Sequence, residues 1–147
     1  MIVSTRVEYG LMALLDIANN SENGFSVSTT DIAERQGISQ KYLEQILPLL
    51  RQAGLIKAQK GLRGGYRLSC PASSVKLSEV INALDTSILA DMDADDEVQG
   101  TLRDSVNECL WKKLNQLIRD YADKVTVSDF LAECKARAGE GRDSYVI

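Results

Sequence analysis

The stretch "DIAERQGISQKYLEQILPLLRQAGLI", residues 31–56, decides the fold. Apolar residues recur at helical spacing on both sides of Gly37, which predicts one helix that ends there and a second helix over 40–53. Ser28 and Ser39 stand where the two helices need their N-caps. Two helices joined by so tight a turn indicate a helix-turn-helix unit.

A glycine-rich segment follows this helix pair. Residues 55–59 and 66–69 are typical of short strands, and "KGLRGG" at 60–65 is typical of the turn between them. The pattern predicts a β-hairpin after the helix pair, which is the wing of a winged helix-turn-helix domain. Glycines permit positive φ and close backbone approach to another surface, and the cations suit phosphates and the minor groove. The wing residues that we expect at DNA are Lys57, Lys60, Gly61, Arg63, Gly64, Gly65, Tyr66 and Arg67. The alternative is an ordinary hairpin whose charges are only solvated.

The first turn of the second helix carries side chains that suit DNA bases. Gln40 can hydrogen-bond to a base edge, and Lys41 can bind a phosphate or a guanine. We expect contacts in the major groove from Ser39, Gln40, Lys41, Tyr42 and Gln45, and further backbone contacts from Arg6 and Tyr9. The alternative is a solvated helix N-terminus without a ligand.

The charge of the chain is unevenly distributed. The net charge is −4, but residues 30–70 hold seven Lys and Arg against three Asp and Glu, a local charge of +4. Residues 71–147 hold nine Lys and Arg against fifteen Asp and Glu, a local charge of −6. A polyanion responds to the local field, so the acidic total is compatible with DNA binding.

The whole chain is predicted to be mainly α-helical with one small β-hairpin. Residues 1–85 form a winged helix-turn-helix domain with a linking helix, and 86–100 an acidic loop. Residues 101–135 form a long helix and a short C-terminal helix, and 136–147 a tail. The acidic loop could bind a hard cation through oxygen ligands, but it lacks the glycine and the spacing of an EF-hand, which favours a solvated linker.

The long helix carries an apolar stripe that the preceding domain is too small to cover. A second copy of the chain related by a twofold axis would cover the rest, so we expect a homodimer. The expected dimerisation residues are Leu102, Val106, Cys109, Leu110, Trp111, Leu114, Leu117, Ile118 and Tyr121. Cys109 is either a small hydrophobic residue at this interface or a thiol redox switch.

Several function classes are excluded by what the sequence lacks. It contains no histidine, no nucleophile–base pair and no phosphate-binding loop, so we expect no enzymatic activity. The three cysteines are far apart and odd in number, which disfavours a disulfide framework and a structural zinc site. No run of eighteen apolar residues and no signal peptide is present, so we expect no membrane association and a cytoplasmic location.

These motifs, together with "STRVEYGLMALLDIA" at 4–18, "LSEVINALD" at 77–85 and "LW" at 110–111, closely resemble the Rrf2 family of bacterial transcription regulators. Within that family, the members that regulate iron–sulfur cluster biogenesis are the most similar. The resemblance covers roughly residues 1–135 and implies a homodimeric DNA-binding protein on a near-palindromic operator. We expect it to act as a repressor or other regulator of transcription. The resemblance also implies that Glu44 lies near the bases and tunes which sites are accepted.

The resemblance fails at the residues that hold a cofactor in some of these relatives. Cluster-binding members carry Cys-x5-Cys-x5-Cys-x2-His in the linker before the long helix, and bind [2Fe–2S] or [4Fe–4S]. In this chain those positions hold Asp93, Gln99, Ser105 and Glu108, and Glu8 matches an acidic ligand of some relatives. Iron–sulfur clusters are held by Cys and sometimes by His, so we expect no cluster and no metal. Two alternatives stay open: a regulator whose ligand cysteines have been substituted, and a cluster-free regulator that acts through a protein partner such as a metabolic enzyme.

Overall fold

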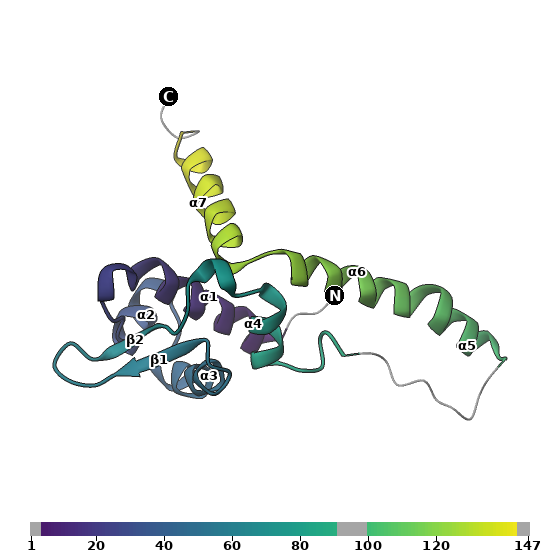
Figure 1. Ribbon diagram of the computed structural model, residues 1–147, viewed down its shortest axis with the longest axis horizontal. Coiled ribbons are helices and arrows are strands. Elements are labelled where there is room, and N and C mark those ends of the chain that lie inside the picture. The colour runs from purple at the N-terminus through teal and green to yellow at the C-terminus, as the bar shows by residue number, and fades with distance from the viewer. Residues whose placement is uncertain (1–3, 91–99, 144–147) are drawn as a thin grey trace.

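The computed structural model describes residues 4–90 and 100–143 and confirms the predicted fold class. A helical body carries a hairpin on one side, and two helices project from the body in different directions (Figure 1). In chain order the elements are α1 (Thr5–Asn20), the 3-10 helix η1 (Glu22–Gly24), α2 (Thr29–Gln36), α3 (Gln40–Gln52), β1 (Ile56–Gln59), β2 (Gly65–Leu68), the 3-10 helix η2 (Ala72–Ser74), α4 (Leu77–Leu84), α5 (Leu102–Val106), the π-turn η3 (Asn107–Trp111), α6 (Lys112–Lys124) and α7 (Val127–Asp143).

The helix-turn-helix forms as its local signals predict. The Ser28 hydroxyl accepts a hydrogen bond from the Asp31 N–H at 3.1 Å, and the Ser39 hydroxyl accepts one from the Tyr42 N–H at 3.1 Å. Gly37 ends α2 with φ at 65°, a conformation that glycine adopts without strain. These caps fix where α2 ends and where α3 begins.

The hairpin has a third strand-like neighbour that the sequence did not reveal. β1 and β2 pair antiparallel from Ile56 opposite Leu68 to Gln59 opposite Gly65. Val27 forms an antiparallel bridge to Tyr66, with two N–H···O=C bonds of 2.8 Å each. The segment between α1 and α2 therefore ties the wing to the helical body.

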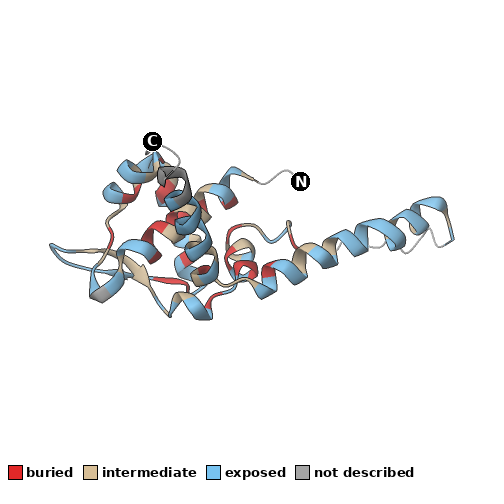
Figure 2. Ribbon diagram, turned by 90° about the horizontal axis from the view of Figure 1, so that it is seen from above, coloured by how far each residue is buried: buried red, intermediate tan, exposed pale blue. Residues whose placement is uncertain are grey.

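The core lies between α1 and the helices packed around it. The long helix from α5 to α6 projects from this core and is largely exposed (Figure 2). At the α1–α4 contact, a side chain in place of Gly10 would put its Cβ 2.4 Å from a Leu84 methyl group. Glycine inside a helix is unfavourable by itself, so close packing accounts for it here. The core side chains that are inaccessible to solvent include Leu14, Ile17, Ile32, Leu43, Ile46, Leu47, Leu50 and Val80.

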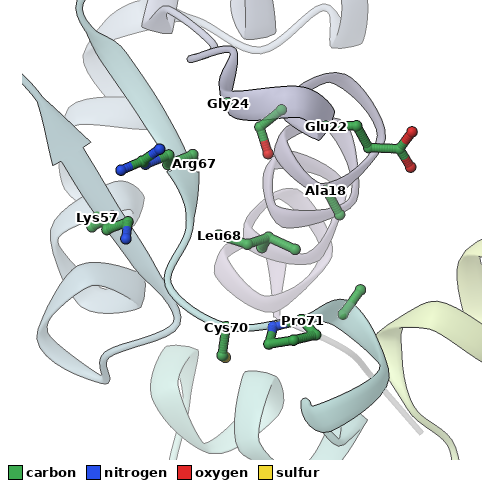
Figure 3. Close-up of a pocket in the computed structure, with 10 residues that line it drawn as sticks. Ala18, Glu22, Gly24, Lys57, Arg67, Leu68, Cys70 and Pro71 are labelled. Carbon is green, nitrogen blue, oxygen red and sulfur yellow. The ribbon is translucent and has the colours of Figure 1, made fainter.

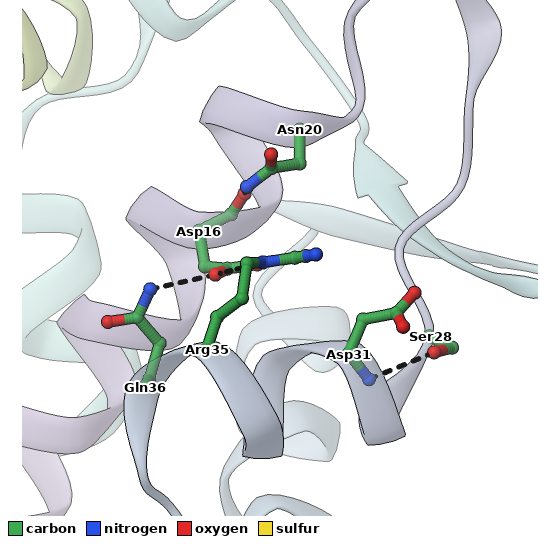
Figure 4. A network of polar contacts seen from close by, with 6 residues as sticks. All are labelled: Asp16, Asn20, Ser28, Asp31, Arg35 and Gln36. Atoms are coloured by element: carbon green, nitrogen blue, oxygen red, sulfur yellow. Dashed lines mark hydrogen bonds and ion pairs between the residues drawn. The ribbon is translucent and has the colours of Figure 1, made fainter.

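A buried carboxylate joins α1 to α2 (Figure 4). Asp16 of α1 accepts hydrogen bonds from Arg35 Nε at 2.9 Å, Arg35 Nη2 at 2.8 Å and Gln36 Nε2 at 2.8 Å. Burial alone raises the pKa of this carboxyl, but hydrogen bonds from Arg35 and Gln36 and the charge of Arg35 outweigh burial and hold the pKa below its ordinary value. The ionised Asp16 thus fixes α2 against α1.

The long helix is continuous from Leu102 to Lys124, as predicted, but a π-turn interrupts it. The turn is closed by the Lys112 N–H, which donates to the carbonyl of Asn107, five residues earlier. The C-terminal helix is longer than predicted. It runs to Asp143, so the expected tail at 136–147 is corrected: residues up to Asp143 are helical, and 144–147 lie outside the described residues.

Candidate nucleic-acid interface

The first turn of α3 presents its polar side chains to solvent. Gln40, Lys41, Glu44 and Gln45 are exposed, while Leu43 between them is fully buried. One face of the helix therefore packs on the core, and the opposite face is open to solvent and to a ligand. Gln40 Nε2 also donates to the Thr30 hydroxyl of α2 at 3.2 Å, which places the starts of the two helices together.

Tyr9 and Tyr42 lie against each other. Their rings meet edge to face with centroids 5.6 Å apart, and both side chains are half-buried. This contact joins α1 to the first turn of α3, as such aromatic pairs do in protein cores. Arg6 is exposed on the same helix as Tyr9. DNA contacts by Arg6 and Tyr9 stay predictions, and ring packing accounts for part of what the two tyrosines do.

The tip of the wing is a tight turn. The Gly64 N–H donates to the Gly61 carbonyl at 2.8 Å, so Leu62 and Arg63 occupy the two central positions of this turn. Gly61 has φ at 116°, which other residues rarely adopt. Lys60, Leu62 and Arg63 are all exposed. The tip thus presents two cations and one leucine.

Gly64 and Gly65 have internal roles that the sequence reasoning did not identify. A Cβ on Gly64 would lie 2.8 Å from the carbonyl oxygens of Gln59 and Gly61. A Cβ on Gly65 would lie 2.4 Å from the carbonyl oxygen of Val27. These two glycines are therefore needed because other backbone segments of the same chain pack closely against them. This packing determines the shape of the wing.

A cavity of about 840 Å³ connects the tip of the wing to the start of α2. Leu62, Arg63 and Gly64 line one side, and Ser28 and Asp31 line another. Since Thr30 of α2 also bonds to Gln40, the wing tip, the start of α2 and the start of α3 lie at the same end of the domain. The sequence predicted these segments separately, and the fold brings them together.

The four wing cations do not form one cluster. Lys57 and Arg67 are opposite each other on β1 and β2 and line a separate cavity of about 350 Å³ that also includes Cys70 (Figure 3). Arg67 Nε is buried without a hydrogen-bond partner among the described residues. Of the four cations, Lys60 and Arg63 alone belong to the tip, since they lie in the turn between β1 and β2, whereas Lys57 and Arg67 lie within the strands.

The positions of the family's cofactor ligands do not supply suitable donors. Asp93 and Gln99 lie outside the described residues, and Ser105 and Glu108 are exposed on the long helix, where Glu108 forms an ion pair with Lys112. Within residues 4–90 and 100–143, no three His, Cys, Asp or Glu side chains are grouped as metal ligands. A hydroxyl and an ion-paired carboxylate do not fit an iron–sulfur cluster.

The apolar stripe of the long helix is exposed in the single chain. Leu102, Leu117 and Tyr121 are 82%, 66% and 58% exposed, and the other residues of the stripe are also exposed to solvent, except Ile118. Ile118 is half-buried and packs on the core of its own chain, and its contact with a second copy stays a prediction. Cys109 is exposed, and its burial as a small hydrophobic residue would require a second chain.

Residues 3–133 match the family described as Rrf2, iron-dependent transcriptional regulator. The HTH-type transcriptional regulator IscR of Vibrio parahaemolyticus is 36% identical over 134 residues, which cover 90% of this chain and 79% of the relative. The structure of CymR, the global cysteine regulator of B. subtilis, matches with a TM-score of 0.77 at 26% identity, over 90% of this chain and 98% of CymR. The structure of T. potens IscR matches with a TM-score of 0.73 at 34% identity, over 91% of this chain and 88% of that one. Among the described helices, none has the length and apolar character to cross a membrane.

Proposed function

This chain belongs to the Rrf2 family of helix-turn-helix transcription regulators, and we propose that it binds a near-palindromic DNA operator as a homodimer and represses transcription from it. The observation that carries this proposal is the common position of the α3 start and the wing tip at one end of the domain. A recognition helix and a wing must reach the same duplex together, and a shared end of the domain allows that.

Different parts of this surface have different tasks in the proposal. Gln40 and Lys41 read base edges in the major groove, because they are exposed on the first turn of an α3 that Leu43 anchors. Lys60 and Arg63 bind phosphates and the adjacent minor groove. Glu44, exposed on the same face as Gln40, repels phosphate and accepts from cytosine N4, which restricts the sequences that fit.

The π-turn supports the proposed homodimer, because it keeps the apolar stripe on one side of the helix. Leu102 and Tyr121 are nineteen positions apart, whereas five α-helical turns take about eighteen residues. An uninterrupted helix would place Tyr121 about 100° out of line with Leu102. A turn closed over five residues takes up one residue more than an α-turn and restores the alignment.

The proposed regulator binds no iron–sulfur cluster, because Ser105 and Glu108 do not supply the ligands that a cluster needs. We expect no absorbance in the visible region after anaerobic incubation with iron and sulfide. A stable visible spectrum with bound iron and sulfide would contradict this part of the proposal and leave the DNA-binding part intact.

DNA binding is tested with a duplex that the full chain enriches from a random 30-base-pair library. Arg63→Ala should weaken binding and reduce the slope of log Kd against log salt by about 1.8, since one phosphate contact is lost at each of the dimer's two wing tips. Gln40→Ala should reduce the preference for the enriched duplex over random DNA more than it weakens binding to random DNA. Arg51→Ala, an exposed arginine in the last turn of α3, is the matched control and should change neither quantity. Failure to enrich any duplex would refute the proposed function.

A further inference from the structure

Leu62 is the most exposed large apolar side chain of the described residues, with a relative exposure of 109%. It occupies a central position of the Gly61–Gly64 turn at the tip of the wing, directly before Arg63. Such tips in water usually carry Gly, which permits positive φ, or Asn, Asp or Ser, whose side chains form local hydrogen bonds that a leucine cannot form. One exposed leucine is ordinary on a protein surface, so its place beside Arg63 is what matters here.

We propose that Leu62 enters the minor groove of DNA next to Arg63 and acts as an apolar wedge that partly unstacks one base step. This inference rests on the proposed function. Leu62 and Arg63 are neighbours in one closed turn, so a wing that brings the Arg63 guanidinium to the minor groove brings the Leu62 side chain to it as well. Apolar side chains inserted between base steps kink the duplex toward the major groove.

The surroundings of Leu62 permit this contact. The cavity of about 840 Å³ that Leu62 helps to line leaves room next to the leucine, and Phe25 on the same cavity is itself 64% exposed. The wing carries Lys60 and Arg63 on either side of Leu62, and cations at this position draw the tip to the strongly negative minor groove.

The wedge adds a preference that base-edge hydrogen bonds do not provide. Pyrimidine–purine steps such as TA and CA/TG unstack most easily. A leucine that opens one step therefore favours operators with such a step under the wing. Leu62 would then contribute to sequence selection through DNA deformability, while α3 selects through direct contacts.

The test uses a series of the enriched 30-base-pair duplexes, each with 2-aminopurine in place of one base in the segment flanking the α3 site. The fluorescence of 2-aminopurine rises when the base is unstacked. The full chain should raise the fluorescence at one step under each of the dimer's two wings. Leu62→Ala should abolish this rise and weaken binding about a hundredfold, since about tenfold is expected for the burial of each of the dimer's two leucine side chains. The salt slope should stay unchanged, because Leu62 carries no charge.

Two control variants assign the effect to this side chain. Leu62→Met keeps the length and apolar character and should retain the fluorescence rise. Phe25→Ala removes the other exposed apolar side chain of the cavity and should retain it too. Unchanged affinity and fluorescence in Leu62→Ala, or equal loss of signal in Phe25→Ala, would overturn the inference and leave the proposed function standing. A wild-type chain that enriches no duplex would overturn the proposed function itself.

Discussion

The π-turn at Asn107–Trp111 leads to an asymmetric prediction: the proposed dimer should tolerate deletion of one residue in this turn, but not insertion of one. Deleting Glu108 leaves eighteen positions between Leu102 and Tyr121, which is five ordinary turns. The turn can then become α-helical without moving either half of the stripe. Inserting an alanine after Glu108 adds a second surplus residue, which one π-turn cannot take up.

The size of the effect follows from the side chains that leave the interface. The insertion rotates Leu102 and Val106 by about 100° relative to the rest of the stripe. These are four side chains per dimer, and at about 1 kcal/mol each for partial burial their loss costs about 4 kcal/mol. The dimer dissociation constant should therefore rise about a thousandfold after insertion. After deletion it should change by less than about tenfold.

Light scattering coupled to gel filtration over a dilution series measures these constants, and circular dichroism checks that helix content is retained. Equal weakening of the dimer by the deletion and the insertion would refute the alignment by the π-turn. Tight dimers for both variants would show that the stripe is not the interface. A wild-type chain that stays monomeric at micromolar concentration would refute the proposed homodimer.

Two further predictions concern the helical body. Arg35→Ala should lower stability by about 2 kcal/mol in urea unfolding relative to Arg51→Ala, between the values for exposed and buried ion pairs, because the Arg35 side chain is 41% exposed and that of Asp16 is 0% exposed. Since the pKa of Asp16 is lowered, its contribution is present at neutral pH and is lost as the pH falls through the folded-state pKa. In Arg35→Ala the pKa of Asp16 should rise, because burial raises it and the main opposing group is lost, so acid unfolding should begin at a higher pH. An unchanged urea midpoint and an unchanged acid-unfolding profile would contradict the role of this pair. Gly10→Ala should cost about 1–3 kcal/mol through overlap with Leu84, and a Gly10→Ala, Leu84→Ala double variant should lose less than the sum of the two single losses, so strict additivity would exclude the overlap.

The elements that the sequence predicts correctly depend on residues close together in the chain. Ser28, Ser39 and Gly37 act on helix ends within three residues of themselves, and the hairpin follows from strands joined by five residues. The placement of Gln40, Lys41 and Arg63 on exposed surface follows from the same local patterns. Apolar spacing and capping chemistry therefore suffice for the helix-turn-helix and the wing.

The features that the sequence does not reveal depend on contacts between distant residues. Position 10 requires glycine because the side chain of Leu84 packs against it, and position 65 requires glycine because the carbonyl of Val27 does. Asp16 in the first helix looks like an ordinary polar residue until Arg35 and Gln36 are packed against it. Local patterns carry no information on which distant residue lies opposite. The π-turn is different, because the nineteen-position spacing of the stripe already contains the surplus residue.

The division of the wing cations changes how strongly the wing can bind DNA. Lys57, Lys60, Arg63 and Arg67 lie within eleven residues and suggest one site of charge +4. In the fold, Lys57 and Arg67 line the cavity with Cys70, so the tip itself delivers two positive charges. Each phosphate contact contributes about 0.9 to the salt slope, so the two tips of a dimer would contribute about 3.6. A wing of this charge positions the domain on DNA, and selection among sequences must then depend on α3 and on the one apolar side chain at the tip.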